Sequence, residues 1–121
     1  MARIMVVDDS PTDVQNLKSM LSKAGHIVIE ATSGQDAIER IKAEKPDCVI
    51  MDVVMPGMNG FQATRTLSKD AATAHIPVLV VSSKNQETDR VWALRQGARD
   101  YIVKPVKEAD LIAKINTVLG Q

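Results

Sequence analysis

The sequence predicts a doubly wound α/β fold, in which a parallel sheet of five strands is covered by helices on both faces. Short apolar runs alternate with amphipathic segments along all 121 residues. The apolar runs are continuously hydrophobic, as is typical of strands buried on both faces. No low-complexity stretch, charge block or Ser/Gly linker divides the chain, so one domain spanning residues 1–121 is expected, with no effector domain.

The first strand is expected at residues 4–7, where Ile-Met-Val-Val precedes an acidic pair. Ser10 then caps a helix, with Pro11 at its first position and Asp13 three residues after the cap. Gly25 ends this helix. Apolar residues recur along it with the helical period and form its inner face, which consists of Val14, Leu17, Leu21 and Ala24.

The second strand is expected at residues 27–31. Ser33 and Asp36 cap the second helix, which ends before Pro46. Its apolar face consists of Ala37, Ile38 and Ile41. The apolar run 48–51 predicts the third strand.

Residues 55–60 are dense in turn residues and predict a loop. A third helix follows, with an inner face of Phe61, Thr64 and Leu67. Pro77 precedes the fourth strand, expected at residues 78–81. A fourth helix is expected at about residues 86–96, where Gly97 stops it.

The fifth strand is expected at residues 101–103. A last helix carries the apolar face Leu111, Ile112, Ile115, Val118 and Leu119. Strict alternation of strands and helices, with strands buried on both sides, implies a parallel sheet between two helical layers. In such folds, ligands bind outside the carboxyl ends of the strands.

Composition excludes several classes of function. Fifteen basic and fifteen acidic residues cancel, which argues against bulk attraction to nucleic acid or to a membrane surface. Cys48 is the only cysteine, so no internal disulfide is possible, and a reducing compartment fits best. The N-terminus resembles neither a signal peptide nor a membrane span. A cytoplasmic location is therefore expected.

Polar residues follow four of the five predicted strands. Asp8 and Asp9 follow the first, Asp52 the third, Ser82 the fourth and Lys104 the fifth. Because parallel strands bring their carboxyl ends to one edge, three carboxylates are expected to share a pocket. Two like charges about 5 Å apart repel by roughly 3 kcal/mol at an effective dielectric of about 20. Such a cluster needs neutralisation.

A divalent cation together with Lys104 would balance the three carboxylates. Oxygen ligands favour Mg²⁺ over zinc. The sequence offers no Cys/His cluster for zinc, because His26 and His75 are isolated and are expected to be surface imidazoles. Mg²⁺ is therefore the expected cofactor.

A carboxylate beside Mg²⁺ and a lysine is a competent phosphoryl acceptor, because both cations stabilise charge on the transferring oxygens. Asp52 is the candidate acceptor and Ser82 a candidate hydrogen-bond partner of the phosphoryl group. Each residue alone has an ordinary interpretation, since acidic pairs favour helix N-termini and single aspartates favour turns. Their conjunction at the ends of four of the five predicted strands favours a site.

The chain resembles the receiver domains of two-component response regulators over its whole length. The resemblance rests on Asp8-Asp9, on Asp52 before Val-Val-Met-Pro-Gly-Met-Asn-Gly, and on Ser82, Tyr101 and Lys104-Pro105. It implies the flavodoxin-like strand order 2-1-3-4-5 and a cis Lys104–Pro105 peptide bond. It also implies a signalling protein that assists its own phosphorylation and dephosphorylation, in place of an enzyme that turns over substrate.

The resemblance further implies roles for single residues. A histidine kinase would phosphorylate Asp52. Asp9, Asp52 and the backbone carbonyl of Val54 would hold Mg²⁺, with Asp8 assisting through a water molecule. Ser82 and Tyr101 would form a switch pair.

Two positions depart from common family patterns. Val54 stands where many relatives carry a polar side chain that influences the lifetime of the acyl phosphate. Ser83 stands where the smallest residues are common, and it would slightly narrow access to Asp52.

A narrower similarity, to the PilH-type regulators of bacterial twitching motility, lies outside the chemistry, in residues 60–65, 86–92 and 95–101. It implies a chemosensory pathway that controls type IV pili, a CheA-like kinase as phosphodonor, an output protein of unknown identity and a monomeric regulator. With no effector domain, output would come by contact with a partner or by draining phosphate from a shared kinase.

Alternative functions stay open at this point. A flagellar-type chemotaxis regulator or a phosphorelay intermediate would carry the same site. An aspartate-nucleophile phosphatase is more remote, because such enzymes want an Asp-x-Asp arrangement after the first strand and here the pair is adjacent. A dinucleotide-binding domain fails because no G-x-G-x-x-G follows the first strand.

Two single residues complete the expectations. Val91 and Leu94 are taken to mark the inward face of the fourth helix, so Trp92 is expected to be partly exposed near the Tyr101 face. Trp92 would then either cover its own helix or contact a partner. Cys48, inside an apolar strand, is expected to be an inert buried thiol.

Overall fold

Five parallel strands form one sheet in the order β2-β1-β3-β4-β5, as expected. The computed structural model describes residues 1–120. The strands are β1 (Arg3–Val7), β2 (Ile27–Ala31), β3 (Cys48–Met51), β4 (Val78–Ser82) and β5 (Asp100–Val103). The helices are α1 (Pro11–Lys23), α2 (Gly34–Glu44), α3 (Gly60–Lys69), α4 (Glu87–Arg95) and α5 (Glu108–Val118).

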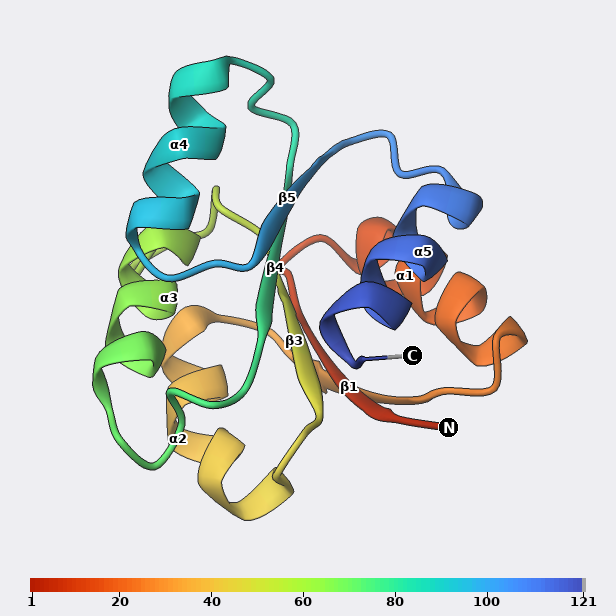
Figure 1. Ribbon diagram of the computed structural model, residues 1–121, viewed down its shortest axis with the longest axis horizontal. Helices are drawn as coiled ribbons and strands as arrows, with labels where there is room; N and C mark the ends of the chain where they lie inside the picture. The colour runs from red at the N-terminus through yellow and green to blue at the C-terminus, as the bar shows by residue number, and fades with distance from the viewer. Residues whose placement is uncertain (121) are drawn as a thin grey trace.

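Helices cover both faces of the sheet (Figure 1). α1 and α5 lie on one face, and α2, α3 and α4 lie on the other. Successive strand residues point to opposite faces, so Met5 and Val7 join the core beneath α2, α3 and α4. Ile4 and Val6 join the core beneath α1 and α5. Burial on both sides explains why the inner strands β1, β3 and β4 are almost continuously apolar, whereas the edge strand β2 carries the exposed Glu30.

The boundaries differ from the expected ones by single residues. β1 begins at Arg3, β4 extends to Ser82 and β5 begins at Asp100, because each of these residues pairs with a neighbouring strand. α4 is one residue shorter at each end than residues 86–96. In the described residues, no helix is both long enough and apolar enough to span a membrane.

The expectation for His26 was wrong. Its side chain is buried, and its Nδ1 accepts a hydrogen bond of 3.1 Å from the backbone N–H of Ala2. That N–H would otherwise lack a partner at the start of the sheet, so the imidazole is a structural group and not a surface one. His75 is exposed, as expected.

The inward face of α4 was also assigned wrongly. Val91 is 38% exposed and Leu94 is only partly buried, whereas Ala93 is fully buried and Gln96 is 5% exposed. A small side chain such as Ala93 lets the helix approach the sheet closely, and apolar size alone therefore misled the face assignment. Trp92 is 50% exposed, which confirms that part of the prediction.

Candidate functional site

Carboxyl ends of neighbouring strands gather three aspartates at one edge of the sheet. Asp8 and Asp9 follow β1, and Asp52 follows β3. The backbone N–H of Asp52 donates a hydrogen bond to the carbonyl of Val7 at 2.9 Å. Each carboxylate offers one oxygen to a cluster in which all these oxygens lie within 4.8 Å of one another. Asp8 and Asp52 are buried, and Asp9 is exposed. The predicted acidic cluster is therefore present.

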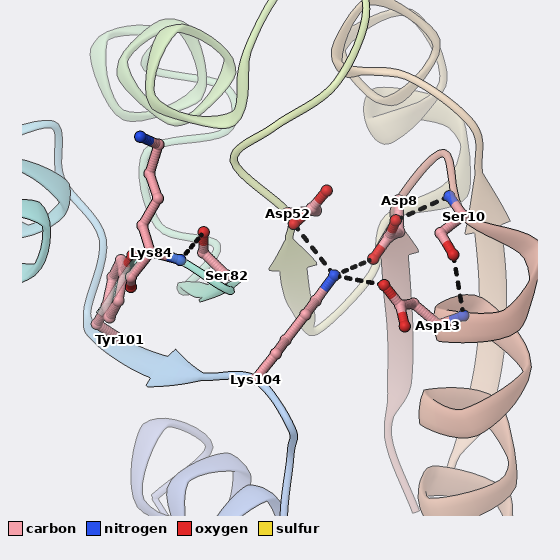
Figure 2. Close-up of polar contacts among 8 residues, drawn as sticks. All are labelled: Asp8, Ser10, Asp13, Asp52, Ser82, Lys84, Tyr101 and Lys104. Atoms are coloured by element: carbon pink, nitrogen blue, oxygen red, sulfur yellow. Dashed lines mark hydrogen bonds and ion pairs between the residues drawn. The ribbon is translucent and has the colours of Figure 1, made fainter. Parts of the chain in front are cut away.

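Lys104 reaches this cluster from the end of β5 (Figure 2). Its Nζ lies 3.0 Å from Asp8 Oδ2 and 3.2 Å from Asp52 Oδ1. A third carboxylate oxygen, Asp13 Oδ2, lies at 2.7 Å. The Lys104–Pro105 peptide bond is cis, as predicted.

The electrostatics of the site follow from burial and crowding. Burial raises the pKa of Asp52, repulsion from Asp8 raises it further, and Lys104 only partly offsets both. Burial by itself lowers the pKa of Lys104, but its hydrogen bonds to Asp13 and Asp8 outweigh this and hold that pKa well above its ordinary value. Lys104 is therefore a permanent cation here, and Asp52 is held as an anion at a cost.

Mg²⁺ fits the chemistry of this donor set. Asp8, Asp9 and Asp52 supply hard oxygen donors within one small cluster, and one of them is open to solvent, as a cation that keeps several waters requires. Val54 follows Asp52 by two residues and is 60% exposed, and the role expected of its carbonyl stays a prediction.

Ser82 and Tyr101 lie beside the acidic cluster and do not bond to it. Ser82 is fully buried at the end of β4, where its Oγ accepts a hydrogen bond of 3.1 Å from the N–H of Lys84. The Tyr101 hydroxyl donates to the carbonyl of Lys84 at 2.7 Å. Burial raises the pKa of Tyr101, so the hydroxyl keeps its proton at neutral pH. Figure 2 shows both side chains meeting at the Lys84 segment, across from Lys104.

Asp13 is the site residue that sequence reasoning missed. The pattern Ser10-x-x-Asp13 predicts a helix cap, and half of that cap exists, because Ser10 Oγ accepts a hydrogen bond from the N–H of Asp13 at 3.3 Å. The reciprocal half is absent: the N–H of Ser10 donates instead to Asp8 Oδ1 at 2.9 Å. This frees the Asp13 carboxylate for Lys104. The signal in the sequence was a third acidic residue, four positions after the Asp8-Asp9 pair.

Comparisons with known proteins agree with this geometry. The family model described as "Response regulator receiver domain" matches residues 4–116. Protein PilH of Pseudomonas aeruginosa is 59% identical over 120 residues, which is 99% of each chain. Chemotaxis protein CheY of Thermotoga maritima is 38% identical over 117 residues, covering 96% of each.

Solved structures give the same result. A putative response regulator from Chloroflexus aurantiacus superposes with a TM-score of 0.95 at 28% identity, covering 99% of this chain and 98% of that one. Chemotaxis protein CheY4 of Vibrio cholerae superposes with a TM-score of 0.90 at 27% identity, covering 98% of each. This chain belongs to the response regulator receiver domain family.

Proposed function

We propose that this protein accepts a phosphoryl group from a histidine kinase on Asp52, in the presence of Mg²⁺. Receiver domains in general take phosphoryl groups from such kinases. The observation that carries the assignment to Asp52 is its contact with Lys104 at 3.2 Å inside a cluster of three carboxylates. Asp52 also follows β3, the middle strand of the sheet.

The transfer would make one bond and break one. An Asp52 carboxylate oxygen attacks phosphorus while the P–N bond of the donor phosphohistidine breaks, and the departing imidazole takes up a proton from solvent. Lys104 keeps its proton and donates a hydrogen bond to a phosphoryl oxygen. Ser82 donates another once its hydroxyl turns from the Lys84 segment.

Asp9, Asp52 and the Val54 carbonyl would hold Mg²⁺, with Asp8 assisting through a water molecule. When bound, the ion neutralises charge on the phosphoryl oxygens. The protein would act as a regulator that labels itself once per cycle.

The pathway we propose is a chemosensory one that controls type IV pilus twitching motility. Support comes from 59% identity to PilH across nearly the whole of both chains. The phosphodonor would be a CheA-like kinase, and the regulator would be a cytoplasmic monomer whose output is contact with another protein or removal of phosphate from the kinase. A flagellar-type chemotaxis role is the second candidate, favoured by the 38% identity to a CheY.

Labelling with acetyl phosphate tests the proposal. With Mg²⁺ present, intact-protein mass spectrometry should record one added phosphoryl group, and EDTA should prevent it. Asp52→Asn should abolish labelling. Asp110→Asn, which removes an exposed carboxylate from α5, is the control and should label normally. Undiminished labelling of Asp52→Asn would refute the assignment, and release of many phosphates per chain from a phosphomonoester would indicate a phosphatase.

A further inference from the structure

The shortest polar contact of Lys104 is with a residue outside the three-aspartate cluster. Its Nζ lies 2.7 Å from Asp13 Oδ2, compared with 3.2 Å from Asp52 Oδ1. Asp13 belongs to the first turn of α1, not to a strand end. In Figure 2, Asp13 and Asp52 approach the ammonium from different sides. The Lys104 ammonium is therefore shared between the candidate acceptor Asp52 and Asp13 of α1.

An ammonium group has three N–H donors. In this structure, Lys104 makes three hydrogen bonds, to Asp8, Asp13 and Asp52. An arriving phosphoryl oxygen can receive a hydrogen bond from Lys104 only if one of these acceptors gives up its own. Asp13 is the most exposed of the three, with a side chain 38% accessible compared with 2% for Asp8 and 9% for Asp52. Solvent can replace Lys104 at Asp13 more readily than at the buried carboxylates.

The charge balance points the same way. Lys104 and a divalent cation would neutralise Asp8, Asp9 and Asp52, but Asp13 adds one further negative charge, and among the described residues its ion-pair partner is the same Lys104. Phosphorylation adds further negative charge at Asp52. Asp13 thus opposes the phosphorylated state both by holding Lys104 and by repulsion, and the first effect depends on Lys104 whereas the second does not.

We propose that Asp13 is a positioning residue that competes with the phosphoryl group for Lys104 and so slows phosphorylation of Asp52. The inference rests on the proposed function. In the unphosphorylated protein, Asp13 holds the ammonium toward α1. During transfer from acetyl phosphate, an Asp52 oxygen bonds to phosphorus, the P–O bond to acetate breaks and acetate leaves, while Lys104 exchanges Asp13 for a phosphoryl oxygen.

The test compares initial labelling rates with acetyl phosphate at saturating Mg²⁺. Asp13→Asn keeps the shape of the residue and its backbone bond to Ser10 but removes the charge, and it should label about two- to fivefold faster, the range of a partly exposed ion pair. Asp36→Asn is the matched control. Asp36 occupies the same position after its cap Ser33 in α2, on a helix that does not contact Lys104, and its variant should label like the wild type.

Two further measurements separate competition for Lys104 from other roles. In a Lys104→Ala background, the gain in labelling rate from Asp13→Asn should shrink to the smaller part that repulsion alone supplies; a gain of undiminished size would show simple repulsion and overturn the inference. In metal-free, unphosphorylated protein at mildly acidic pH, the Lys104 ammonium signal in ¹⁵N-edited NMR should exchange with water faster in Asp13→Asn than in Asp36→Asn. Equal exchange would mean that Asp13 does not hold the ammonium.

The outcomes distinguish this inference from the proposed function. Wild-type protein that takes no label would refute both. Wild-type protein that labels at Asp52, with Asp13→Asn equal to it or slower, would overturn the competition alone. A slower variant that also unfolds at lower denaturant concentration would assign Asp13 to tethering α1.

Discussion

The Cα of Gly60 lies against the backbone carbonyl oxygen of Asp52, and a Cβ built on Gly60 would overlap that oxygen. The N–H of Gly60 also donates to the carbonyl of Val53 at 2.9 Å. The first residue of α3 is thus locked onto the loop that carries the candidate acceptor. Any side chain at position 60 must move this loop.

Gly60→Ala is therefore expected to affect both stability and the site. The clash is with backbone, which cannot turn aside as a flexible side chain can. We expect a loss of about 1–3 kcal/mol in the free energy of unfolding, typical of overpacking, and slower labelling of Asp52. Urea denaturation measures the loss of stability, and the acetyl phosphate assay measures the labelling rate. Thr66→Ala, an exposed change in the same helix, is the control, and equal stability of the two variants would contradict the packing argument.

Stability should depend on pH through Asp52 in metal-free protein. Its pKa in the folded state is raised, chiefly by burial, above the ordinary value of 3.8. Between the ordinary and the raised value the folded state binds more protons than the unfolded one, so the free energy of unfolding falls as pH rises through this window. Asp52→Asn avoids that loss and should be more stable than the wild type at neutral pH.

Denaturation in EDTA across the acid range measures this effect. The advantage of Asp52→Asn should shrink as pH falls toward 3.8, where the wild-type carboxyl becomes neutral too. Adding Mg²⁺ at neutral pH should raise the denaturation midpoint of the wild type more than that of Asp52→Asn, because a ligand that binds the folded state stabilises it. An Asn variant that is less stable than metal-free wild type at neutral pH would contradict the electrostatic account.

Cys48 should be unreactive in the folded protein. Its side chain is fully buried in β3, and burial raises the pKa of the thiol to about 12. Because only the thiolate is nucleophilic, iodoacetamide at a pH of about 8.5 should modify it no faster than the chain unfolds. The control is Ser22→Cys in a Cys48→Ala background, which places a thiol on the exposed part of α1 and should react at once. Rapid labelling of native Cys48 would show that β3 opens locally.

The strands and most of the site were predictable from the sequence because they rest on one strong rule. Strands buried on both faces must be continuously apolar, so the first polar residue after each run marks a strand end. Parallel pairing then brings those ends together, which is why Asp8, Asp52 and Lys104 meet in space although Lys104 lies 96 residues after Asp8 and 52 after Asp52.

Three features were not predicted, because the sequence pattern allows more than one contact or packing arrangement for the residues concerned. Asp13 suits a helix cap and an ion pair equally well in sequence, and the choice is made by Asp8, which takes the N–H of Ser10 for itself. His26 is buried where its imidazole accepts a hydrogen bond from the N–H of Ala2, a partner 24 residues away that the local pattern does not reveal. The inner face of α4 is set by the small volume of Ala93, which hydrophobicity ranks below Val91.

The observed inward face of α4 predicts different costs of substitution at two adjacent positions, one buried and one half-exposed. Ala93 is fully buried, so Ala93→Leu should cost about 1–3 kcal/mol through overpacking. Trp92 is 50% exposed, so Trp92→Ala should change the free energy of unfolding by no more than about 0.5 kcal/mol, as surface substitutions usually do.

Trp92 also reports on itself, because it is the only tryptophan in the chain. It lies in a shallow surface groove with Glu87, Thr88, Val91 and Arg95, so its fluorescence should be red-shifted and readily quenched by acrylamide.

A half-exposed indole within an apolar and charged groove is suited to anchor a protein partner. We therefore expect Trp92→Ala to label normally at Asp52 yet weaken output in cells, measured as complementation of a strain that lacks this gene. Thr88→Ala, in the same groove, is the control for loss of a small side chain. Full complementation by Trp92→Ala would show that the ring only covers its own helix, and a blue-shifted, unquenched emission would place it in the core.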